Sequence, residues 1–94
     1  MVQLNPKSVV KKEENIPFKE IENEGILLNL KNGDYFTVDS LGLLIWKSID
    51  GKKNLGQIAE RVTARYEVSK GTALSDLIGF VKSLHTKELV AVLG

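Results

Sequence analysis

The residue types that most often carry catalysis are scarce in this sequence of 94 residues. There is no cysteine, which removes disulfides, thiolate nucleophiles and cysteine-ligated metal clusters. His85 is the one histidine, and no cysteine stands beside it to share a zinc ion. Because Lys82 and Lys87 flank it, we expect His85 at an exposed helix end, in a structural or solvent role.

Carboxylates and hydroxyls show no catalytic spacing either. Glu20 and Glu22 alternate as residues on the solvent side of a strand do. Asp34 belongs to a turn, and Asp39 stands where a helix cap is expected. The serines lack the flanking glycines of a nucleophile elbow, and no glycine-rich phosphate loop is present. We predict a protein that is not an enzyme, with no catalytic residue, no metal and no cofactor.

Composition narrows the possible partners. Thirteen Lys and Arg against twelve Asp and Glu leave a net charge of +1, too little for a strong positive field. Binding to nucleic acid or to anionic membranes depends on such a field. The apolar runs are far shorter than the roughly 20 residues of a membrane span, and the N-terminus lacks a signal-peptide pattern. We predict a soluble, cytoplasmic protein without membrane contact.

Two parts are expected along the chain. Residues 1–17 carry Pro6 and Pro17 around a charged run and predict a partly flexible arm, with one short strand at Val9-Val10. Residues 18–94 predict a single domain. Three strands are expected first, over residues 18–22, 25–30 and 35–38, with Asn32-Gly33 as the turn of the second hairpin. The first half therefore predicts an antiparallel three-stranded β-meander.

The second half has the period of helices. Asp39 and Ser40 can cap a helix that ends at Asp50-Gly51. Asn54 and Gln57 form the capping-box spacing at the start of a second helix. A third helix is expected over residues 69–87, followed by a short strand over 89–92. The order predicts an α+β, winged helix-turn-helix-like fold.

The third helix has more apolar residues than one packing face needs. We predict that Ala73, Leu77, Phe80 and Leu84 face the core, and that Leu74, Ile78 and Val81 lie on the neighbouring stripe. If the strand over 35–38 is a sheet edge, its free main-chain groups beside that stripe suit the addition of a peptide strand. The alternative is that the stripe completes the core and the arm covers the edge. Gly79, inside the helix, favours a close approach by the strand layer or by a peptide.

Two other functions remain open at this stage. A winged helix-turn-helix fold can bind DNA, but the third helix has no Arg, Asn or Gln to contact base edges. Arg61 and Arg65, on the second helix, could contact DNA phosphates, but two arginines form only a small basic surface. The alternative function is thus a winged-helix DNA-binding regulator. A small interaction subunit that forms a homodimer through its edge strand is the third.

An ordered set of segments resembles the PqqD family, the RiPP recognition elements. The resemblance covers most of the chain, and Trp46, within it, is expected in the core. Two positions depart from the family pattern: Asp39 replaces the usual Asn, and Lys87-Glu88-Leu89 replaces a common Gly-Leu. The matching segments are Gly25-Ile26-Leu27-Leu28-Asn29-Leu30, the run from Gly33 to Asp39, Leu43-Leu44-Ile45-Trp46, Ile49-Asp50-Gly51, Ile58-Ala59, Tyr66-Glu67-Val68, Asp76-Leu77 and Leu84.

The resemblance implies a non-catalytic peptide chaperone. Members of the family bind the leader segment of a ribosomally made precursor peptide and present it to a modifying enzyme, often a radical SAM protein or a cyclase system. The leader adds as a strand beside the third strand and packs against the third helix. A link to pyrroloquinoline quinone itself is not implied. Carried over by position, the peptide-binding residues are Tyr35, Phe36, Thr37, Val38, Leu74, Leu77, Ile78 and Val81.

Overall fold

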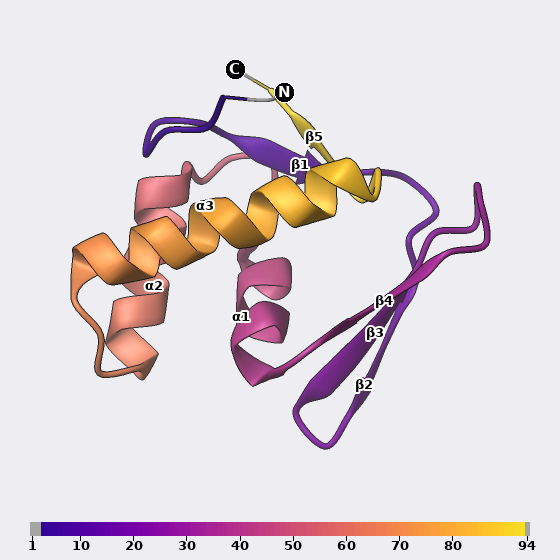
Figure 1. The fold of residues 1–94 in the computed structure, drawn as a ribbon, viewed down its shortest axis with the longest axis horizontal. Coiled ribbons are helices and arrows are strands. Elements are labelled where there is room, and N and C mark those ends of the chain that lie inside the picture. The colour runs from indigo at the N-terminus through magenta and orange to yellow at the C-terminus, as the bar shows by residue number, and fades with distance from the viewer. Residues whose placement is uncertain (1–2, 94) are drawn as a thin grey trace.

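The computed structural model describes residues 3–93, which form five strands and three helices. The predicted order of a meander, three helices and a terminal strand is confirmed (Figure 1). Before the meander there is one more strand. The elements are β1 (Val10–Lys12), β2 (Phe18–Ile21), β3 (Glu24–Leu28), β4 (Tyr35–Val38), α1 (Ser40–Ser48), α2 (Leu55–Arg65), α3 (Lys70–Thr86) and β5 (Val90–Val92).

The strands form two separate antiparallel sheets. β2, β3 and β4 follow one another in the larger sheet, with Leu27 opposite Phe36 at its centre. At the hairpin between β3 and β4, Gly33 has φ +80°, the left-handed conformation that glycine adopts most easily. β1 pairs with β5, and Val10 lies opposite Val92. The larger sheet extends away from the helices, and the smaller sheet lies along the C-terminal half of α3 (Figure 1).

Each helix begins at an N-cap residue whose side chain accepts a hydrogen bond from the first turn. Asp39 accepts a hydrogen bond from the Gly42 N–H, and Ser69 accepts one from the Thr72 N–H. Asn54 and Gln57 bond to each other's main-chain N–H groups at 2.8 Å, so the predicted capping box is present. Because these contacts are local, the helix starts could be predicted from sequence spacing.

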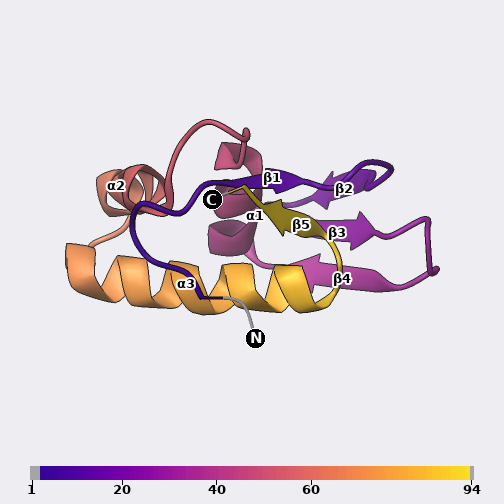
Figure 2. The same cartoon turned by 90° about the horizontal axis from the view of Figure 1, so that it is seen from above.

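The core lies where α1 meets α2, α3 and the base of the larger sheet. Trp46 is fully buried there, as its position in the sequence indicated. α3 crosses α1 at a steep angle in Figure 1, and β4 is the strand of the larger sheet nearest to α3 in Figure 2. None of the helices in residues 3–93 is long and apolar enough to cross a bilayer.

The segment before β2 is bound to the rest of the chain. The Leu55 N–H donates to the Ser8 carbonyl at 2.9 Å, and the Gly56 N–H donates to the Pro6 carbonyl at 2.9 Å. Val10 is fully buried. The short strand expected at Val9-Val10 therefore lies one residue later, and its partner is the terminal strand, since β1 and β5 form a sheet of their own.

Candidate functional site

β4 is an open edge of the larger sheet. Within residues 3–93 it pairs with β3 alone, so the arm does not cover it. The Asn29 N–H donates to the Asp34 carbonyl at 2.8 Å, which fixes the hydrogen-bonding phase of the hairpin. In an antiparallel pair, every second residue of a strand bonds to its partner strand through both its N–H and its C=O, and the residues between them point these groups the other way. The N–H and C=O groups that point away from β3 are consequently those of Tyr35 and Thr37.

Phe36 and Phe80 join this edge to α3. Their rings meet edge to face, with centroids 6.2 Å apart and an interplanar angle of 61°. Gly42 of α1 lies beneath them, since a Cβ at this position would lie 3.2 Å from two atoms of the Phe80 ring and 3.0 Å from the Val38 Cβ. Both rings are half-buried. They therefore form an apolar wall whose outer side faces solvent beside the open strand.

The buried face of α3 differs by one residue from the prediction. Val81 is fully buried, and Phe80 lies on the flank of the helix. The interpretation that placed Phe80 in the core and Val81 outside it was wrong. A spacing of four, four and three residues keeps the buried stripe on one side of a helix of 3.6 residues per turn. That stripe consists of Ala73, Leu77, Val81 and Leu84.

Leu74 and Ile78 lie on the opposite flank of α3 from Phe80. At about 100° per residue, Phe80 lies roughly 60° to one side of Leu77, whereas Ile78 lies about 100° to the other. Since Phe80 contacts Phe36, β4 is on the Phe80 side. Leu74 and Ile78 are half-buried and packed against the core away from β4.

The structure thus brings few of the predicted site residues to the groove. Phe36 lines it, and Tyr35 and Thr37 are exposed on the strand. Their side chains lie on the outer face of the sheet, in register with Leu28 and Ile26. Three other predicted residues are buried and can only support the groove from below; they are Val38, Leu77 and Val81. Peptide contact by any of these residues stays a prediction.

Other residues of α3 lie beside β4 and were not predicted. A hollow of about 320 Å³ lies next to the Phe36 ring at the C-terminal half of α3. A smaller cavity of about 50 Å³ lies near its N-terminal half, between the three helices. The signal in the sequence was the i, i+4 spacing of Asp76 and Phe80, which places both on one flank. The hollow is also lined by Lys82, Ser83, Thr86 and Lys87.

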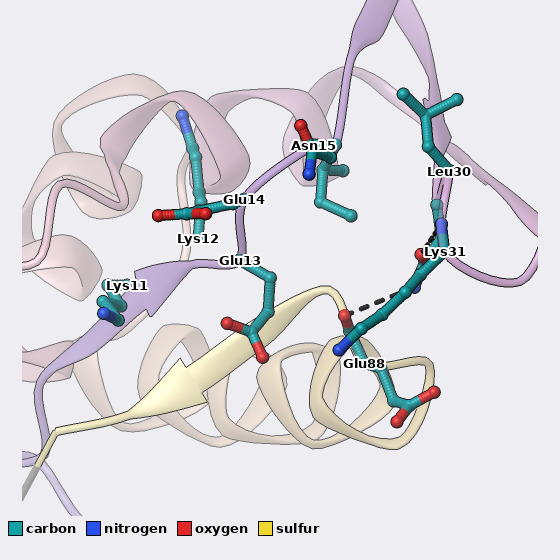
Figure 3. A pocket seen from close by; sticks show the side chains of 10 residues that line it. Lys11, Lys12, Glu13, Glu14, Asn15, Leu30, Lys31 and Glu88 are labelled. Carbon is teal, nitrogen blue, oxygen red and sulfur yellow. Dashed lines mark hydrogen bonds between the residues drawn. The ribbon is translucent and has the colours of Figure 1, made fainter.

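A more polar hollow, of about 420 Å³, lies between β1, the β3–β4 hairpin and the end of α3 (Figure 3). Lysines and glutamates line it, and no group of three or more carboxylate or imidazole ligands within residues 3–93 could hold a metal ion. Burial lowers the pKa of Lys12, one of its residues, while the Asp50 charge opposes that shift. The Lys12 ammonium lies 4.9 Å from the centroid of the Trp46 ring. Lysine and glutamate side chains of this hollow lie beside β1, and Lys12 contacts α1 through Trp46. No residue of β4 lines the hollow, so it is separate from the open strand edge.

The fold and the site define a class of protein: a small α+β domain whose uncovered edge strand runs beside an apolar helix flank. The family model of coenzyme PQQ synthesis protein D, PqqD, matches residues 24–90. The chain belongs to the PqqD family. No curated protein matches the sequence.

Solved structures agree with this assignment. TbiB1, in complex with the TbiA(beta) leader peptide, is 32% identical, with 85% of this chain and 93% of TbiB1 covered and a TM-score of 0.79. Lasso peptide synthetase B1, complexed with the leader peptide, is 21% identical over 87% of this chain and 96% of its own, with a TM-score of 0.78. The PqqD part of Methylobacterium extorquens PqqCD, described as a RiPP recognition element, is 19% identical over 95% of both chains, with a TM-score of 0.80. The last two show the fold alone.

Proposed function

We propose that this chain binds the leader segment of a ribosomally made precursor peptide as an added strand on β4 and presents it to a modifying enzyme. The observation that carries the proposal is the open β4 edge beside the Phe36–Phe80 wall. TbiB1, which is similar to this chain over most of its length, is described in complex with a leader peptide. The chain itself contributes recognition and no chemistry.

Strand addition divides affinity and selectivity between main chain and side chains. The outward N–H and C=O groups of Tyr35 and Thr37 offer hydrogen bonds to any extended peptide, whatever its sequence. Alternate side chains of the added strand would point toward α3 and meet the Phe36 and Phe80 rings. Burial of apolar area against these rings stabilises the complex by roughly 25 cal/mol per Å² before the costs of ordering the peptide.

The β4 edge also determines which partners the chain can bind at one time. The enzyme that receives the peptide is a modifying enzyme of a precursor-peptide pathway, with a radical SAM protein as the candidate that the family resemblance suggests. Two copies of this chain joined through β4 would bury the strand on which the peptide adds. A homodimer of that kind would therefore compete with the peptide, and the monomer is the binding form. We place this activity in the cytoplasm.

An NMR titration tests the proposal directly. The ¹⁵N-labelled chain would be titrated with synthetic leader peptides from small reading frames that adjoin its gene. We expect the amide shifts to concentrate on Tyr35, Thr37 and residues 76–87, from α3 to its C-cap. Duplex DNA is the control ligand. If it shifts α3 in a salt-sensitive way while no leader moves β4, the regulator alternative replaces the proposal.

A further inference from the structure

One flank of α3 forms a continuous stripe on the side where Phe80 meets β4. Asp76, Phe80, Ser83 and Lys87 follow one another at spacings of four, three and four residues, which keeps them on the same side of the helix. The contact between Phe80 and Phe36 fixes the direction in which this stripe faces. A peptide strand on β4 would run along it from one end to the other.

The end of the stripe near the β3–β4 hairpin is basic. The hollow there has the Phe36 ring as its apolar wall and the side chains of Lys82 and Lys87 at its rim. Among residues 3–93, the ion pairs are made by other lysines, and neither Lys82 nor Lys87 has a carboxylate partner. Both are exposed. This end therefore offers two uncompensated positive charges beside an aromatic ring, which suits an acidic side chain.

The other end of the stripe has a largely apolar cavity beside the exposed Asp76 side chain. The small cavity beside Asp76 is lined by Leu41 of α1, Tyr66 after α2, and Ala73 of α3. Val68, 41% exposed, stands at its rim. With about 50 Å³, against about 320 Å³ at the basic end, the cavity fits the end of an aliphatic side chain and not an aromatic ring.

The distance between the two ends sets a spacing in the peptide. The residues of α3 and its C-cap, Lys87, that line the two ends centre about nine positions apart, which corresponds to roughly 14 Å at 1.5 Å per residue. A strand that rises about 3.4 Å per residue covers that length in about four residues. Because four is even, side chains at both ends point to the same face of the added strand, the face toward α3.

From this geometry we infer that the groove selects a leader segment in which an aliphatic residue is followed, four positions later, by an acidic residue. This inference rests on the proposed function. The order follows from antiparallel addition, the pairing of the whole β2–β3–β4 sheet and the commoner one in proteins. Leu41, which lines the aliphatic cavity, follows the C-terminal end of β4, whereas Phe36, which lines the basic hollow, lies near the start of that strand. A peptide antiparallel to β4 that continues beyond Val38 therefore reaches the aliphatic cavity first and the lysines last.

Designed peptides test the spacing and the charge separately. The reference peptide is Thr-Leu-Thr-Val-Thr-Glu-Thr, with acetyl and amide ends, and its dissociation constant would be measured by NMR titration. Replacement of Glu by Lys should weaken binding about fivefold, as expected for two exposed ion pairs. Replacement of Leu by Ala or by Trp should also weaken binding. The peptide with Leu and Glu exchanged should bind less tightly than the reference.

Charge reversal in the protein tests the same contact from the other side. The double variant Lys82→Glu/Lys87→Glu should prefer the Lys peptide over the Glu peptide. The control, Lys7→Glu/Lys52→Glu, changes the net charge equally at exposed positions away from the groove and should keep the original preference. A double variant that still prefers the Glu peptide overturns the inference.

Failure of the inference can be told apart from failure of the proposed function. If a natural leader from an adjacent reading frame shifts β4 while the designed peptides do not bind, the selectivity rule is wrong and leader binding stands. If neither kind of peptide shifts β4, both are wrong.

Discussion

Asn29 and Glu88, fifty-nine positions apart in the sequence, are joined by a hydrogen bond from the Asn29 side-chain amide to the Glu88 carbonyl. The same amide also donates to the carbonyl of Lys87. Asn29 begins the β3–β4 hairpin, and Glu88, with φ +59°, reverses the chain after α3. One buried amide thus ties the strand wall of the groove to its helix wall.

Removal of this amide should destabilise the fold. Asn29 is 2% exposed, and its side-chain oxygen also accepts a hydrogen bond from the Lys31 N–H at 2.9 Å. Asn29→Ala would remove all three hydrogen bonds of this buried side chain, so we expect a loss of about 1–3 kcal/mol. Urea denaturation measures the change. Asn32→Ala, in the exposed turn of the same hairpin, is the control and should cost no more than about 0.5 kcal/mol.

Acid stability should depend on Asp50. Its carboxylate accepts hydrogen bonds from the N–H groups of Lys52 and Lys53 and pairs with the Lys53 ammonium at 2.7 Å. These contacts hold the pKa of Asp50 well below its usual range. A folded pKa below the unfolded one stabilises the fold above about pH 4, and this contribution is lost as the pH falls further.

Asp50→Asn should therefore flatten the acid limb of the stability curve below about pH 4. Thermal unfolding measured between pH 2 and pH 7 would show the effect. Asp34→Asn is the control, because the Asp34 side chain makes no hydrogen bond within residues 3–93. An equal flattening in both variants would contradict the role of Asp50.

Local patterns in the sequence predicted most of the elements. Asn54 and Gln57 cap α2 through main-chain groups three residues away, and Gly33 supplies the left-handed residue of the hairpin. Such contacts depend on neighbours in the chain. The pairing of β1 with β5 does not, since it joins Val10 to Val92. A strand of three residues is too short for its alternation of apolar and polar residues to identify a partner strand at the other end of the sequence.

The candidate site was predicted only in part, because it depends on which flank of α3 meets β4. Phe80 and Val81 both fit an apolar stripe with Leu77 and Leu84, so periodicity alone cannot choose between them. The choice is made by another helix. Gly42 leaves room for the Phe80 ring beside it, and the ring then reaches Phe36. A sequence pattern within α3 contains no information about α1.

Gly42 should therefore be intolerant of even a methyl group. In Gly42→Ala, the new Cβ would lie 3.0 Å from the Val38 Cβ and 3.2 Å from the Phe80 ring. Both contacts are tighter than usual, so β4 at Val38 and the Phe80 ring must each shift, and we expect a loss of about 1–3 kcal/mol. Urea denaturation measures it. The same substitution in a Phe80→Leu background should cost less, and equal costs in both backgrounds would contradict the contact.

Thr37→Pro tests the open edge itself. Proline removes the outward N–H of this residue, and it is tolerated on an edge strand where that group faces solvent. One lost hydrogen bond is worth about 0.5–1.5 kcal/mol, and the ring adds a clash with an incoming strand. We expect leader binding to weaken about tenfold or more, with little loss of stability. Thr37→Val keeps the N–H and should bind normally. Binding by the proline variant at full strength would exclude strand addition at Thr37.

Gly79→Ala should change stability and binding in opposite directions. Glycine inside a helix costs about 1 kcal/mol relative to alanine, yet Gly79 is exposed and a Cβ there would meet nothing within 4 Å. The strand layer therefore does not require this glycine. It lies one turn from Asp76 and from Ser83, whose hydroxyl donates to the Gly79 carbonyl at 3.2 Å, and thus borders the groove. A bound strand could approach the helix closely at this point.

We therefore expect Gly79→Ala to raise the free energy of unfolding by up to about 1 kcal/mol and to weaken leader binding. Gly71→Ala is the matched control, because it lies in the first turn of α3, also with nothing within 4 Å of an added Cβ. It should stabilise the fold without affecting binding. Urea denaturation and peptide titration of the two variants separate helix propensity from contact with the peptide. If Gly79→Ala binds leader as tightly as the wild type, the peptide does not approach α3 at this residue.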